Sequence, residues 1–188
     1  LAARIDTLPT AEKRLLQDAA VIGHDVPFAL LHAICGMQED EVRGLLGNLQ
    51  ASEFLYNTQL FPDLQFTFKH SLTHDVAYAG LRHERRREMH ERVVQRMEAL
   101  YADRLDEQVE RLADHALRGH LFEKAVQYLR RAGEKARDRE AYPEAVVLLE
   151  KALEALSHLP DNLARDQLAI DLRFDLRNAL QPLGDRKR

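Results

Sequence analysis

The hydrophobic period of this chain changes between residues 54 and 69, and that change restricts the fold. Residues 65–69 (QFTFK) alternate polar and apolar side chains, which is the pattern of a strand with one buried face. Residues 54–56 form a short apolar run before it, and residues 61–63 (FPD) indicate a turn between the two. Elsewhere apolar residues recur every three or four positions, as in amphipathic helices. We therefore expect an all-α protein with one small β-hairpin.

Three helices are expected before the hairpin. Residues 11–22 carry one apolar face and end at Gly23, a residue type that often terminates helices. Residues 27–35 and 38–52 follow, each with its own apolar stripe. Three helices and then a hairpin is the order of a winged helix, so we assign residues 1–81 to a winged-helix-like module.

Helical periodicity returns at Ser71 and continues to the end of the chain. We assign residues 82–106 to a connecting helix. From residue 107 the apolar stripes come in pairs, separated by Gly119-His120 and by residues 159–161 (LPD). This pattern predicts antiparallel helical pairs over residues 107–188.

Residues 126–159 alternate small and large side chains in a way that suits two closely packed helices. The positions concerned are Leu129, Ala132, Gly133, Ala136, Tyr142, Ala145, Leu149 and Ala152. At these spacings the segment resembles a tetratricopeptide repeat, in which small residues allow close approach and large ones fill the surrounding space. About three such repeats are normally needed to bury a continuous core, so we expect the array to continue beyond Arg188. A generic helical bundle is the alternative.

Composition restricts the partners. The net charge is −4 and the sequence pI is near 6.2, whereas nucleic-acid-binding domains are usually basic. Cys35 is the single cysteine, which excludes an internal disulfide and a multi-cysteine metal site and fits a reducing, cytoplasmic compartment. No apolar run approaches the ~20 residues of a membrane span, and we expect no membrane partner.

Histidines are the main candidates for chemistry. His70 and His74 are four residues apart with Asp75 beside them, but no third ligand and no HExxH pattern accompanies them, so we expect no metal site. No nucleophile lies in a recognisable setting, so we expect no catalytic residue. We interpret His83 and His90 as surface residues.

Two features of the sequence bear on DNA binding, namely a basic cluster and the winged-helix order of elements. Arg82, Arg85, Arg86 and Arg87 form a possible docking face, but glutamates interleave with them at spacings that favour pairs within one helix. The helix over residues 38–52, which would read bases, carries three acids in its first turn and one arginine, Arg43. We therefore expect a solvated, ion-paired face and no nucleic-acid partner.

The order of segments resembles the region downstream of the nucleotide-binding domain in STAND-type signalling ATPases. The residues that carry the resemblance are Leu8-Pro9, LLQDAAVIGHDVPFALL (15–31), FKHSLTHDVAY (68–78), RRREMHERV (85–93) and AGEKARDREAYPEAVVLLEKALEAL (132–156). It is similar to bacterial multidomain proteins that join a class III nucleotide cyclase domain or a DNA-binding domain to an AAA-like ATPase and tetratricopeptide repeats.

The resemblance implies a role for His70. In that superfamily the winged-helix module folds over bound nucleotide, and a histidine near its last strand contacts the β-phosphate. His70 is the residue that matches, although it follows Phe68-Lys69 here. On residue type alone, His70 would cap the following helix or bind a nearby carbonyl. The chain lacks a GxxxxGK[ST] loop, so ATP or ADP is implied only for a parent protein.

Three functions follow as expectations. The first is a non-catalytic regulatory segment, cut from a longer chain, that couples an intramolecular ATPase domain to a protein or peptide partner on the helical array. The parent would then have ATPase activity, together with adenylate cyclase activity where the output domain is a cyclase. The second is a stand-alone interaction scaffold, and the third is a winged-helix DNA-binding regulator.

Overall fold

The computed structural model describes residues 2–59 and 63–185, and within them the chain is helical with one small sheet, as the sequence predicted. The chain divides into two compact units, Leu1–Leu100 and Tyr101–Arg188. Each unit is described separately below. The turn expected at residues 61–63 falls largely outside the described residues.

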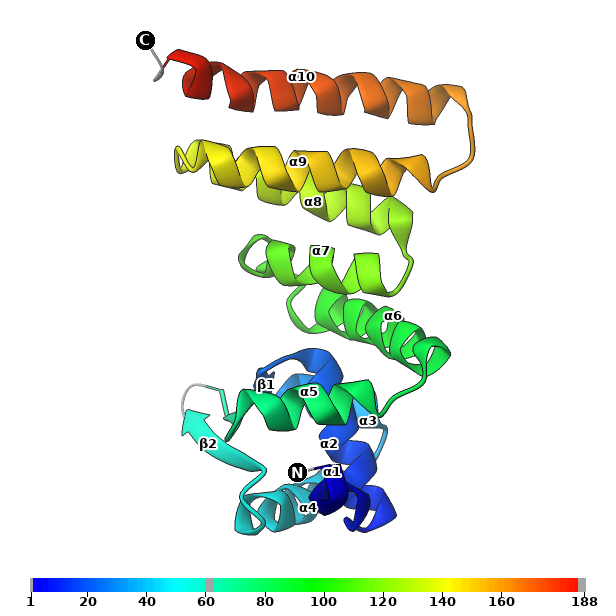
Figure 1. The fold of residues 1–188 in the computed structure, drawn as a ribbon, viewed down its shortest axis with the longest axis vertical. Coiled ribbons are helices and arrows are strands. Elements are labelled where there is room, and N and C mark those ends of the chain that lie inside the picture. Colours follow the sequence, from blue (N-terminus) through cyan, green and yellow to red (C-terminus); the bar gives the residue numbers. More distant parts are fainter. Residues whose placement is uncertain (1, 60–62, 186–188) are drawn as a thin grey trace. The chain divides into compact units, whose positions relative to one another are not determined.

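The first unit contains six helices and three strands among the described residues (Figure 1). They are α1 (Ala2–Asp6), α2 (Thr10–Ile22), β1 (Asp25–Pro27), α3 (Phe28–Cys35), α4 (Glu39–Ala51), β2 (Leu55–Gln59), β3 (Gln65–Phe68), α5 (Ser71–Ala79) and α6 (His83–Leu100). The boundaries of α2, α3, α4 and β3 agree with the expected segments to within one residue, whereas β2 runs three residues past the expected apolar run and α6 ends six residues before residue 106. The additional elements are α1 and β1.

The sheet is antiparallel and has the order β1-β3-β2. Val26 pairs with Phe66, and Tyr56 pairs with Thr67. The expected hairpin is therefore present, but β1 makes it a three-stranded sheet. β1 spans three residues, which is too short to show alternation in the sequence. The resulting order, helix, strand, two helices and two strands, is that of a winged helix.

The core of the first unit joins its helices to the sheet. Leu15 of α2, Leu30 of α3, Leu46 of α4 and Phe68 of β3 are all fully buried. α6 packs on α2 and α3, so it belongs to this unit. The sequence suggested instead that residues 82–106 connect two modules.

The second unit is a stack of helices (Figure 1). Its elements are η1 (Leu105–Gln108), α7 (Val109–Arg118), α8 (Phe122–Asp138), α9 (Tyr142–Ser157) and α10 (Leu163–Asp185). Each of α7, α8 and α9 packs against the next helix, and α10 also contacts α8. The turn after α7 lies at Gly119-His120, where the sequence placed it.

The residues assigned to repeat packing lie between α8 and α9. All are buried except Tyr142, which is half-buried. The closest approach is at Gly133, where an added Cβ would lie 3.0 Å from Leu149 Cγ. A larger residue at this position would therefore need Leu149 to move.

Candidate functional site

His70 lies at the junction between β3 and α5. Its backbone is extended (φ −138°, ψ 136°) and it occupies the N-cap position of α5, with its carbonyl accepting a bond from the Thr73 amide at 2.9 Å. Its side chain makes no capping bond and is exposed. The imidazole of His70 therefore does not cap α5, which was one structural role expected for it.

A shallow pocket of about 420 Å³ surrounds His70. It is lined by Gln50, Glu53, Leu55, Tyr56, Lys69 and His70. Lys69 Nζ donates to Glu53 Oε1 at 2.6 Å, and this bond lowers the pKa of the Glu53 carboxyl. Both side chains are exposed, and exposed ion pairs of this kind contribute little to stability. Lys69 can therefore turn from Glu53 toward an incoming anion at small cost.

The four arginines of the expected docking face do not form one surface. Arg82 and Arg87 are exposed, and Arg87 pairs with Glu91. Arg86 turns inward, donates to the Ala79 carbonyl at 2.8 Å and lies 4.7 Å from the centre of the Tyr78 ring.

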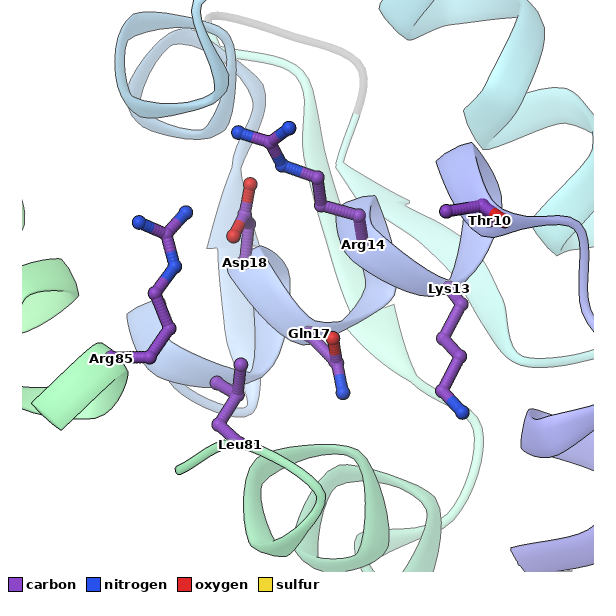
Figure 2. A pocket seen from close by; sticks show the side chains of 7 residues that line it. All are labelled: Thr10, Lys13, Arg14, Gln17, Asp18, Leu81 and Arg85. Carbon is purple, nitrogen blue, oxygen red and sulfur yellow. The ribbon is translucent and has the colours of Figure 1, made fainter. Parts of the chain in front are cut away.

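Arg85 points elsewhere, toward Asp18 (Figure 2). It pairs with Glu88 at 3.5 Å and is partly buried. The expected intrahelical pairs are therefore present for Arg85 and Arg87, whereas Arg86 is tied to α5. Of these four arginines, Arg82 and Arg87 are the exposed ones, and the docking face stays a prediction.

A line of rings runs from the sheet through α5 into α6. His74 meets the edge of Phe68 at 5.3 Å and stacks on Tyr78 at 6.3 Å. Tyr78 Oη and His90 Nε2 are joined by a hydrogen bond of 3.0 Å. His90 is 2% exposed, so its expected surface position was wrong, whereas His83 is exposed. The sequence missed this contact because α5 and α6 meet only in the tertiary structure.

A second pocket lies between α2 and the start of α6 (Figure 2). Its volume is about 500 Å³, and it is lined by Thr10, Lys13, Arg14, Gln17, Asp18, Leu81 and Arg85. Asp18 is 3% exposed, and burial raises the pKa of its carboxyl from 3.8 to about 6, against the lowering effect of nearby arginines. Sequence reasoning overlooked Asp18. The available signal was an acid on the apolar side of a helix.

The helix that would read bases, α4, begins with an acidic turn. Its first turn holds Glu39, Asp40 and Glu41, all exposed. Arg43 is bound to Glu39 at 2.7 Å and lies 4.4 Å from the centre of the Phe28 ring. DNA phosphates would therefore meet carboxylates at the first turn of this helix. Arg43, in its first half, is already bound to Glu39.

The remaining expectations concern metals and membranes. Within residues 2–59 and 63–185, no group of three or more His, Cys, Asp or Glu side chains is arranged to hold a metal ion. Cys35 is buried, and burial raises the pKa of its thiol. In the same part of the chain, none of the helices combines the length and the apolar character that crossing a membrane requires.

The comparisons with known proteins do not assign the chain to a family: no family model matches it, and no curated protein matches it.

Proposed function

We propose that this chain is a non-catalytic regulatory segment of a STAND-type ATPase. In this proposal the first unit presses on an ATPase domain of the same protein, and the helical pairs of the second unit bind a protein or peptide. Partner binding shifts the balance between closed and open forms, which requires different affinities for the two. The winged-helix element order and the helical stack both support this arrangement.

The observation that carries the proposal is the free imidazole of His70. It lies exposed at the rim of a pocket beside Lys69, and it makes no capping bond to α5. An imidazole can donate a hydrogen bond to phosphate, and it titrates near neutral pH. A lysine next to it adds a mobile positive charge. Together they suit contact with a phosphate held by another domain.

The charge distribution of α4 favours a protein surface over DNA as the neighbour of this module. A DNA-reading helix presents arginine, lysine, asparagine or glutamine to bases and phosphates. The first turn of α4 presents three carboxylates instead. An acidic turn suits contact with a basic protein surface.

The test is ADP affinity of the full-length protein that includes the proposed ATPase domain. His70→Ala should weaken ADP binding by about tenfold, the value of one hydrogen bond to a charged group. His83→Ala is the matched control, because His83 is also exposed but lies at the start of α6. Unchanged affinity in His70→Ala would remove the nucleotide contact from the proposal. No ADP binding by the wild type would refute the ATPase assignment.

A stand-alone interaction scaffold is the second candidate, and exposed apolar side chains of the second unit favour it. Leu163, Ile170 and Phe174 of α10 are 85%, 48% and 51% exposed. Exposed apolar side chains grouped on one helix mark surfaces that bind other proteins. This candidate predicts that the chain alone captures peptides, with loss on Phe174→Ser. Intact peptide binding in that variant would count against it.

A further inference from the structure

The pocket beside Asp18 has the features of a binding site, and nothing in the proposed function uses it. It is an open pocket of the first unit, lined by α2, the segment before α6, and α6 itself. It is therefore separate from the pocket at His70, whose lining residues are entirely different.

The lining of this pocket is positively charged. Lys13, Arg14 and Arg85 contribute three cations against the single carboxylate of Asp18. Lys13 is held by Asp6 at 2.6 Å and Arg85 pairs with Glu88 at 3.5 Å, so Arg14 carries the positive charge that no ion pair among the described residues offsets. The pocket also includes Thr10, the first residue of α2, where the helix dipole adds partial positive charge. An anion is the ligand that this lining favours.

The carboxylate of Asp18 is the acidic group of this pocket. It is 3% exposed and faces the pocket. Figure 2 shows it between the guanidinium groups of Arg14 and Arg85, yet among the described residues it forms no hydrogen bond or ion pair. Buried carboxylates are normally paired, because an unpaired one loses its hydration without compensation. A ligand that supplies a donor as well as negative charge would compensate this carboxylate.

We propose that this pocket binds a phosphate group that carries a proton, either hydrogen phosphate or the monoanion of a phosphomonoester. Its charged oxygens accept hydrogen bonds from Arg14 and Arg85, since guanidinium groups match phosphate geometry. Its P–O–H group donates to the Asp18 carboxylate. The volume of about 500 Å³ leaves room for the remainder of a small ester.

The proton distinguishes phosphate from other oxyanions. A phosphomonoester has a second pKa of about 6, so a fraction of it carries a proton at neutral pH. Sulfate carries none. Burial raises the pKa of Asp18 to about 6 as well, so one proton is readily shared. The groups that face Asp18 are Arg14 on its own helix, Arg85 and Arg92 of α6, and the thiol of Cys35 of α3. None of these accepts the proton near neutral pH.

The test is calorimetric titration of residues 1–188 with inorganic phosphate and with sulfate. Both titrations are made at pH 6.5 and equal ionic strength in a buffer free of either anion. Phosphate should bind saturably and about tenfold or more tightly than sulfate, the value of a hydrogen bond to a charged group. Asp18→Asn should lose the preference for phosphate, because the amide N–H donates to either anion and the charge repulsion against sulfate is gone.

Matched variants locate the site. Arg85→Gln should weaken phosphate binding about tenfold or more. Arg87→Gln, two residues further along α6, should leave it unchanged because Arg87 is outside the pocket. Ribose 5-phosphate serves as the ester probe. Tighter binding of the ester assigns the site to phosphomonoesters, and tighter binding of inorganic phosphate assigns it to the free ion.

Three outcomes would overturn the proposal. Equal affinity of the wild type for phosphate and sulfate would reduce the pocket to a basic patch. A phosphate preference that persists in Asp18→Asn would remove the carboxylate from recognition. Absence of saturable phosphate binding would exclude the site. None of these bears on ADP binding at His70, so the two proposals fail separately.

Discussion

At the scale of single residues, Asp18 shows how burial sets the behaviour of one side chain. A carboxyl whose pKa is raised in the folded state binds protons more readily there than in the unfolded chain. The protonated Asp18 carboxyl therefore stabilises the folded form below the unfolded pKa. This stabilisation is lost as the pH rises from about 4 through about 6. Above pH 6 the ionised, buried carboxylate destabilises the first unit.

Asp18→Asn removes that charge and should stabilise the protein at pH 8. One pKa unit corresponds to about 1.4 kcal/mol, so we expect a gain of about 1–3 kcal/mol at pH 8 and little change at pH 4. Urea denaturation at both pH values, without added phosphate, measures the difference. Asp103→Asn is the control, because Asp103 is exposed and the same change there should alter stability by less than about 0.5 kcal/mol. An equal gain at both pH values would contradict the assignment.

At the scale of elements, the packing of α8 on α9 depends on one glycine. In Gly133→Ala the new methyl group would lie 3.0 and 3.1 Å from two carbons of Leu149. Overpacking costs about 1–3 kcal/mol, and the higher helix propensity of alanine returns about 1 kcal/mol. We expect a net loss of up to about 2 kcal/mol, measured by thermal denaturation.

The matched control is Gly47→Ala in α4, another helical glycine. No atom lies within 4 Å of an added Cβ there, so only the helix propensity changes, and stability should rise by about 0.5–1 kcal/mol. The same substitution is thus expected to have opposite signs at the two sites. A gain at both would show that α8 and α9 can separate to accept a methyl group.

At the scale of the whole molecule, the boundary between units is the feature to test. Met89, Val93 and Met97 of α6 are fully buried in the first unit, where α6 packs on α2 and α3. Residues 1–100 should therefore fold cooperatively alone. Residues 1–81 should not, because the surfaces that α6 covers would be exposed. Urea unfolding followed by circular dichroism compares the fragments, and cooperative unfolding of 1–81 would place the boundary where the sequence suggested.

Local patterns determined most of the secondary structure. The period of apolar residues located the long helices, and strict alternation located β3, because both patterns express which face of a single element is buried. Helix ends were less visible. Glu53, His120 and Glu140 adopt positive φ, although glycine is the usual residue for that conformation.

Only the tertiary structure showed which residues far apart in the sequence lie close together. β1 is a strand only because it pairs with β3, about forty residues later. The pocket at Asp18 exists because α6 brings Arg85 to α2, and His90 is buried because α5 supplies Tyr78. The sequence by itself determined the fold class, the period of each element and the lack of a phosphate-binding loop. Which side chains meet depends on contacts between elements far apart in the chain, and periodicity within one element carries no information about its neighbour.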